Sequence, residues 1–124
     1  MNLNQVTIAS ANTEKSDEFY SQLGLIKIVD ALPNYARFEC PNGESTFSIH
    51  HLEGYRATEG VTLYFETDDL DNTVDKLKLK GFKFTSDPEE KPWLWREAHM
   101  LDPDGHRIIL FQAGDNRKNP PWRI

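Results

Sequence analysis

The strongest constraint on the fold is that one order of elements occurs twice along the chain. In each half, an alternating strand pattern leads into a helical stripe, and a glycine follows the helix: Gly24 and, 57 residues later, Gly81. Short strand patterns follow each glycine, and a turn motif separates the last two, Pro41–Glu44 in one half and Asp102–Gly105 in the other. The repeat predicts two β-α-β-β-β modules sharing one domain of 124 residues.

Residue periodicity predicts the elements of the first module. Alternation over 5–9 places Val6 and Ile8 on one face of a first strand. Polar residues then precede a helix whose predicted buried stripe is Phe19, Tyr20 and Leu23. The remaining strands of this module are predicted at 26–30, 35–40 and 45–51.

The second module follows the same order. Alternation over 61–67 predicts its first strand, and Asp68 and Asp69 suit the start of the helix that follows. The helix buries a stripe spaced i, i+4 and i+7: Leu70, Val74 and Leu77. The later strands are predicted at 82–85, 94–101 and 106–112, with a proline-containing connector over 86–92.

We therefore expect an α+β fold with a first module of about residues 1–54 and a second of about 60–114. One helix over a four-stranded sheet leaves the other sheet face open, so pairing two modules closes those faces around a cleft. The tail, 115–124, has two prolines that favour an extended run. Because the tail also carries Trp122 and Ile124, we expect it to dock on its own module or on a second subunit.

Charge and composition exclude several classes of protein. Twenty acidic residues against 14 basic ones give a net charge of −6, which argues against a partner made of nucleic acid. No apolar run approaches the roughly 18 residues of a membrane span. The single cysteine, Cys40, has no internal disulfide partner, which fits a reducing cytoplasm. The prediction is a cytoplasmic domain that binds neither nucleic acid nor membrane.

Four short motifs lie at regular places along the chain: Gln5–Ile8, Glu18–Leu25, Thr67–Leu70 and Asp102–His106. Their order and spacing resemble the vicinal oxygen chelate superfamily, which includes glyoxalase I, extradiol dioxygenases and bleomycin resistance proteins. The resemblance covers nearly the whole chain. It implies two βαβββ modules that form a cupped mixed sheet around a ligand site, with the helices outside and with homodimers common.

The enzymes of that superfamily hold a divalent metal ion. The resemblance places the corresponding positions at Gln5, about Ser48, Thr62 and about Ile109. Glutamine is a ligand in some glyoxalases, but serine and threonine are poor ligands and isoleucine is none. We therefore expect no metal cofactor.

A rearranged metal site is the alternative. Strand alternation places His50 on the same face as Ser48, so one divalent ion would be held by Gln5 and His50 with Glu66 or His99. The other interpretation of His50 is an ordinary histidine at a strand end. We favour that interpretation because two adjacent histidines without a spaced carboxylate match no metal motif.

The segment Lys91–Glu97 resembles the Pro-Trp-Gly-Arg-Glu segment of bleomycin resistance proteins, in which a tryptophan stacks on planar rings of the antibiotic. Here Leu94 and Trp95 replace the glycine, so either Trp93 or Trp95 takes the stacking role. An indole offers a large rigid face that suits a flat ligand. Arg96 beside it stacks on a ring or binds an acidic group.

We predict a protein of the bleomycin-resistance type that sequesters a small, partly aromatic ligand without a metal. The candidate acid/base pair is Glu97 and His99, provided both face a closed pocket. The alternatives are a metal-dependent glyoxalase-like lyase, isomerase or dioxygenase, and a dimeric interaction module with its tryptophans in the subunit interface. The predicted ligand contacts are Gln5, His50, Thr62, Tyr64, Trp93, Trp95, Arg96 and Phe111.

Overall fold

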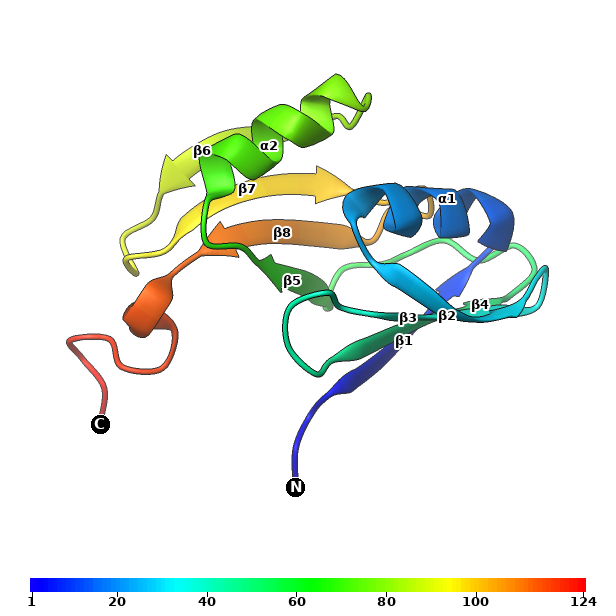
Figure 1. Cartoon of the computed structure of the whole chain (residues 1–124), viewed down its shortest axis with the longest axis horizontal. Coiled ribbons are helices and arrows are strands. Elements are labelled where there is room, and N and C mark those ends of the chain that lie inside the picture. Colours follow the sequence, from blue (N-terminus) through cyan, green and yellow to red (C-terminus); the bar gives the residue numbers. More distant parts are fainter. The chain divides into compact units, whose positions relative to one another are not determined.

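Each half of the chain folds into a strand, a helix and three further strands, as its sequence pattern predicts. The computed structural model describes residues 1–124. Unit 1 is Met1–Thr58 together with Asp102–Gly105, and unit 2 is Glu59–Leu101 together with His106–Ile124. In each unit one helix covers one face of a four-stranded mixed sheet (Figure 1). The predicted α+β class and the paired modules are confirmed.

Unit 1 contains β1 (Gln5–Ser10), α1 (Thr13–Leu23), β2 (Ile26–Ala31), β3 (Tyr35–Glu39) and β4 (Thr46–His51). The strand order in its sheet is β1-β4-β3-β2. Strands β1 and β4 run parallel, whereas β3 pairs antiparallel with both β4 and β2. Helix α1 packs against β3 and β4, the two central strands.

The buried stripe of α1 differs in part from the prediction. Tyr20 is fully buried and its ring packs on the aromatic side chains of the sheet, but Phe19 and Leu23 are only partly buried. Ser16 is fully buried instead, and its hydroxyl lies 2.8 Å from that of Ser10. A short side chain at this position lets the first turns of the helix approach the end of β1.

The turn Asp102–Gly105 comes late in the sequence but packs in unit 1. The Tyr20 hydroxyl donates a hydrogen bond to Asp102 Oδ2 (2.6 Å), and the Ser16 hydroxyl donates to Asp104 Oδ2 (2.9 Å). Burial, and next the charge of Asp102, raise the pKa of Tyr20 far above its usual value. The two carboxylates therefore anchor this turn on α1.

Unit 2 contains β5 (Thr62–Glu66), α2 (Leu70–Leu79), β6 (Ser86–Glu90), β7 (Arg96–Leu101), β8 (Arg107–Gln112) and a 3₁₀ helix, η1 (Gly114–Arg117). Its sheet has the order β5-β8-β7-β6, with β5 parallel to β8. The other pairs are antiparallel. Both units therefore have the same topology.

Helix α2 follows its sequence pattern closely. Leu70, Val74 and Leu77 are buried, which confirms the predicted stripe. Asp69 caps the helix, because its side chain accepts a hydrogen bond from the backbone N–H of Asn72 (3.2 Å). Neither α1 nor α2 is long and apolar enough to cross a lipid bilayer.

The second strand of the second module lies at other residues than predicted. Phe82–Thr85 is not a strand, whereas Ser86–Glu90, predicted as a connector, forms β6 at the edge of the sheet. An edge strand needs ladder hydrogen bonds on one side only, so it tolerates Pro88, and its register shifts between Ser86 and Glu89. The other predicted strands agree with the observed ones to within two residues.

The tail docks on unit 2 only at its start. In η1, Arg117 Nε lies 3.6 Å from Glu66 Oε1 at the end of β5. Beyond it the chain turns, with Arg123 N donating to Pro120 O (3.0 Å), while Trp122 and Ile124 are exposed. Docking of these two side chains on their own module is therefore wrong. Docking on a second subunit stays a prediction.

Candidate ligand-binding site

The sheet of unit 2 has one face on α2 and one face free of it. Gln112 Oε1 accepts a hydrogen bond from the backbone N–H of Leu70 in α2, and Gln112 pairs across the sheet with Arg96. Side chains alternate along a strand, so the neighbours of these two residues point away from α2. The strand register places the following residues together on this helix-free face: Thr62, Tyr64, Glu97, His99, Ile109 and Phe111.

Three aromatic rings gather on the helix-free face and form the aromatic cluster: Tyr64, Trp95 and Phe111. The indole of Trp95 stacks on Phe111, with ring centroids 4.6 Å apart. Tyr64 meets both rings edge-on, at 5.9 Å and 5.7 Å. Trp95 Nε1 donates to the backbone oxygen of Asn116 (3.3 Å), which fixes the indole in its plane. Tyr64 is 50% exposed, so the cluster is accessible at that ring.

Trp93 belongs to a tight hairpin loop between β6 and β7. Leu94 N donates to Lys91 O (2.9 Å) and Lys91 N donates to Trp95 O (2.8 Å), the pattern of a turn followed by a one-residue bulge. The bulge residue, Leu94, has φ 67°, a left-handed conformation that favours glycine. The loop of this chain is therefore strained at Leu94.

Replacing Leu94 by glycine is expected to raise the free energy of unfolding by about 0.5–1 kcal/mol. The left-handed conformation costs a side-chain-bearing residue about 1–2 kcal/mol, and part of that gain is offset by the greater entropy of glycine in the unfolded chain. Denaturant unfolding measures the change. Leu94→Ala is the control, because it removes the side chain and keeps the strain. An equal gain from both substitutions would show that the strain is absent.

A hydrogen-bonded carboxylate lies beside the aromatic cluster. Glu97, on β7, is 1% exposed. Its Oε2 accepts a hydrogen bond from Trp93 Nε1 (2.6 Å), and its Oε1 lies 2.9 Å from His99 Nε2. The His99 ring is about one-third exposed. The structure thus brings Trp93, Glu97 and His99 together, and both tryptophans of the segment belong to the same side of β7.

Arg96 is not part of this group. Its guanidinium lies on the α2 side of the sheet, 2.8 Å from Asp71 and 3.4 Å from Glu90. The hydrogen bond to Asp71 raises the pKa of Arg96 above its usual value. Strand alternation alone separates Arg96 from the flanking Trp95, because neighbouring residues point to opposite faces. The structure does not bring Arg96 together with the aromatic cluster.

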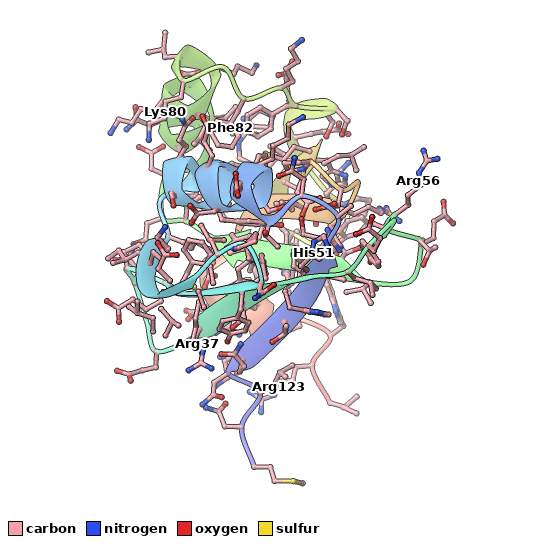
Figure 2. All side chains as sticks on the ribbon, turned by 90° about the vertical axis from the view of Figure 1, so that its right-hand side faces the viewer. Arg37, His51, Arg56, Lys80, Phe82 and Arg123 are labelled. Carbon is pink, nitrogen blue, oxygen red and sulfur yellow. The ribbon has the colours of Figure 1, made fainter.

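In unit 1, the helix-free face carries a polar network instead of aromatic rings. Gln5 Nε2 donates to Ser48 Oγ (2.8 Å), and Ser48 Oγ shares a hydrogen bond with the Tyr35 hydroxyl (2.7 Å). Arg37 Nε donates to the same hydroxyl (2.8 Å). Figure 2 shows Arg37 on the side of this sheet away from α1. The network orients the guanidinium of Arg37 at the surface.

The hydrogen bond between Tyr35 and Ser48, and then Arg37, lower the pKa of Tyr35 below its usual value. Alternation along the third and fourth strands indicated that Tyr35 and Ser48 share one face with Arg37. Alternation does not indicate that the hydroxyl groups of Tyr35 and Ser48 form a hydrogen bond, because that contact depends on the pairing of β3 with β4. Sequence reasoning therefore missed Tyr35 and Arg37 as members of a site.

Comparison with known proteins agrees with this fold. A sequence profile of the Glyoxalase/Bleomycin resistance protein/Dioxygenase superfamily matches residues 2–110. The chain belongs to this superfamily. It is 33% identical to the Bacillus subtilis (strain 168) protein YraH over 129 aligned positions, which cover 90% of this chain and 98% of YraH.

Solved structures of the superfamily have the same fold. One is a bleomycin-binding protein in complex with bleomycin, with a TM-score of 0.71 and 21% identity, covering 90% of this chain and 98% of that one. Another is lactoylglutathione lyase from Agrobacterium tumefaciens, with a TM-score of 0.75 and 14% identity, covering 95% and 96% of the two chains. Since a bleomycin-binding protein and a lyase both match, the fold alone leaves the function open.

The superfamily's metal positions do not form a donor set in this member. Ile109 has no ligand atom, and the amide of Gln5 and the hydroxyl of Ser48 already bond to each other at 2.8 Å. Thr62 adds only a hydroxyl, a weak ligand for a divalent cation. The side chains at these positions therefore do not fit the metal ion that the superfamily's enzymes hold.

The alternative pair, Gln5 and His50, is also separated. Gln5 pairs with Thr46, whereas Ala9 pairs with His50, so Gln5 and His50 are four strand positions apart along the sheet. That separation is about 13 Å at a rise of roughly 3.3 Å per residue. Ligands of one ion lie about 2.0–2.6 Å from it, so the structure does not bring Gln5 and His50 together as ligands.

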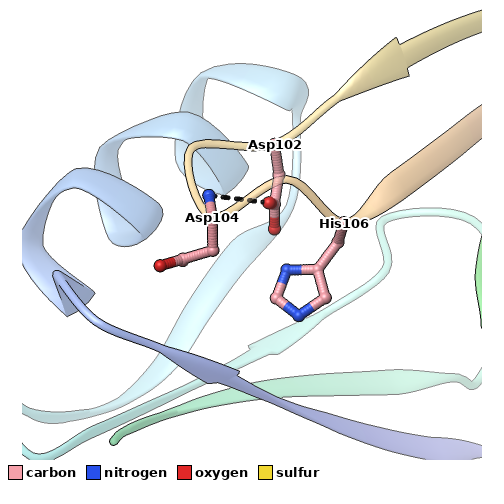
Figure 3. Close-up of side chains that lie close together, drawn as sticks. All are labelled: Asp102, Asp104 and His106. Carbon is pink, nitrogen blue, oxygen red and sulfur yellow. Dashed lines mark hydrogen bonds between the residues drawn. The ribbon is translucent and has the colours of Figure 1, made fainter. Parts of the chain in front are cut away.

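A third group of potential ligands lies in the turn between β7 and β8. Asp102, Asp104 and His106 each place one ligand atom within 4.8 Å of the others (Figure 3). The carboxylates already accept hydrogen bonds: Asp102 from Tyr20 and from Asp104 N (2.9 Å), and Asp104 from Ser16 and the Ala11 backbone (2.8 Å). These contacts hold the turn on α1, which accounts for the two carboxylates as structural residues.

Proposed function

We propose that the protein binds and sequesters a small, partly aromatic molecule on the helix-free face of unit 2, without the help of a metal ion. The observation that carries the proposal is the aromatic cluster, in which Trp95 is held flat on Phe111 beside the half-exposed ring of Tyr64. A rigid set of rings binds a flat molecule with little loss of side-chain entropy. Sequestration needs affinity only, so missing metal ligands do not weaken it.

The superfamily gives independent support. A solved relative of the same fold is a bleomycin-binding protein, and the segment Lys91–Glu97 resembles the one whose tryptophan stacks on the antibiotic in such proteins. An antibiotic-resistance role of this type uses binding alone. Thr62 shares this face of unit 2 and remains a predicted polar contact of the ligand. The predicted contacts Gln5 and His50 belong to unit 1 and stay predictions.

Titration with bleomycin tests the proposal, with the protein first dialysed against a chelator and the heat of binding measured by calorimetry. Trp95→Leu is expected to raise Kd tenfold or more, since stacking of a flat ring on an aromatic side chain contributes about 1–3 kcal/mol. Leu79→Ala is the control, because Leu79 is exposed at the end of α2 and outside the cluster. Equal Kd values for the two variants would contradict the assignment of the site.

A metal-dependent lyase, isomerase or dioxygenase is the competing function. The chemistry of the side chains at the superfamily's metal positions argues against it, above all Ile109, which has no donor atom. Metal analysis of the purified protein separates the two functions. One equivalent of zinc, nickel, manganese or iron per chain, lost together with an activity on chelation, would reverse the proposal.

We also propose that the protein is a homodimer, as is common in the superfamily. The exposed side chains of Trp122 and Ile124 at the end of the tail support a surface that a second subunit covers. Sedimentation at micromolar concentration tests this. A mass near 14.3 kDa, that of one chain, would reject the dimer.

A further inference from the structure

The carboxylate of Glu97 determines which nitrogen of His99 carries the proton. An indole N–H can only donate a hydrogen bond, so Trp93 Nε1 donates to Oε2 at 2.6 Å. A carboxylate can only accept, so the contact of 2.9 Å between Oε1 and His99 Nε2 requires the proton on Nε2. In the neutral ring, Nδ1 is then left as a hydrogen-bond acceptor.

That acceptor has no partner within the protein. The only hydrogen bond of the His99 ring is the one to Glu97, and about one-third of the side chain is exposed. Glu97, in contrast, is 1% exposed, so its carboxylate is buried away from a ligand, and each of its oxygens already has a hydrogen-bond partner. The arrangement holds the imidazole in one tautomer and leaves Nδ1 available.

His99 lies close to the aromatic cluster on the same face. It pairs with Ile109, the residue that also pairs with Tyr64, while Glu97 pairs with Phe111. His99 is thus two strand positions from the row of Phe111, which is about 7 Å. A flat molecule of two fused rings that stacks on the cluster spans this distance.

We propose that the site selects flat aromatic molecules that carry an O–H or N–H donor, which His99 Nδ1 accepts, with Glu97 as the positioning residue. This inference rests on the proposed function, because it assigns a ligand class to the same site. It distinguishes donor-bearing rings, such as phenols, from rings of the same size that carry only an acceptor.

Two probes of nearly equal size test the selectivity: β-naphthol, which has an O–H donor, and isoquinoline, which has only an acceptor nitrogen. Their Kd values are measured side by side in the same slightly alkaline buffer. His99→Phe keeps a ring and removes the acceptor, so its ratio of the two Kd values is the reference. In the wild-type protein the ratio of the isoquinoline Kd to the β-naphthol Kd is expected to be about tenfold higher than in His99→Phe. A tenfold change corresponds to the contribution of one good hydrogen bond.

Glu97→Gln gives a second and opposite result. The only oxygen of the new amide must stay with Trp93, so its NH₂ group faces His99 and donates to Nε2. The proton of the imidazole then moves to Nδ1, which becomes a donor. We expect this variant to favour isoquinoline relative to the His99→Phe reference, and nitrogen NMR of the imidazole to show the change of tautomer. A merely structural role of Glu97 predicts neither change.

The outcomes separate this inference from the proposed function. A wild-type ratio equal to that of His99→Phe overturns the inference, as does binding of bleomycin without binding of either probe. If the wild-type protein binds none of the three molecules, neither bleomycin nor β-naphthol nor isoquinoline, the proposed function is rejected as well. If Glu97→Gln does not fold, the comparison of the wild-type protein with His99→Phe still decides.

Discussion

Asp102→Ala is expected to lower the free energy of unfolding by about 3 kcal/mol. The substitution removes a charged acceptor from the Tyr20 hydroxyl, a bond worth roughly 1.5–3 kcal/mol, and leaves that hydroxyl buried without the acceptor. Tyr20 is 0% exposed and Asp102 is 5% exposed, so water does not easily replace the lost contact. Denaturant unfolding at neutral pH measures the effect.

Two further variants test whether the Tyr20 contact is the cause. In a Tyr20→Phe background the hydroxyl is absent, so Asp102→Ala is expected to cost about 1–2 kcal/mol less than in the wild-type protein. Asp75→Ala removes the same charge from an exposed position on α2 and should change stability by less than about 0.5 kcal/mol. Additive losses in the double variant would show that Asp102 acts through other contacts.

Alkaline pH should destabilise the protein through the same pair. In the unfolded chain a tyrosine loses its proton with a pKa near 10. In the folded protein, burial first and then Asp102 raise the pKa of Tyr20 far above that value. Above about pH 10 the unfolded state therefore binds fewer protons than the folded state, and the free energy of unfolding falls by about 1.4 kcal/mol per pH unit. Below about pH 9 this group contributes no slope.

Unfolding curves at several pH values between 8 and about 11.5 test this slope, with Tyr20→Phe as the control. Other titrating groups contribute equally to both proteins, so the difference between the two isolates Tyr20. The stability advantage of the wild-type protein at pH 8 is expected to shrink by about 2 kcal/mol by pH 11.5. A constant difference over this range would mean that Tyr20 titrates normally in the folded protein.

Local patterns were sufficient for most of the fold. Gly24 and Gly81 both have a positive φ and mark the helix ends that the sequence indicated. The pattern fails at β6, which lies in the proline-containing segment 86–92 that it predicts as a connector. A proline is compatible with a strand only at a sheet edge, and edge position is a property of strand order that a local pattern does not contain.

The candidate site was predictable in its faces but not in its contacts. Side chains two positions apart on a strand point to the same face, so alternation placed Glu97 and His99 on one face of β7. Trp93 lies in a loop, outside any alternating pattern. The hydrogen bond between Trp93 and Glu97 depends on the geometry of the hairpin loop at Leu94. Leu94 has a left-handed backbone conformation that is usual for glycine and not for leucine.

The amino-acid pattern alone thus specified the repeated order of elements, the helix boundaries and the faces of the strands with clear alternation, since each depends on neighbours within a few positions. Packing alone specified which distant side chains meet. Tyr20 and Asp102 are 82 positions apart, and Gln5 and Ser48 are 43 apart. Strand register and the packing of a turn against a helix determine which of these residues come into contact. A local periodicity in the sequence contains neither.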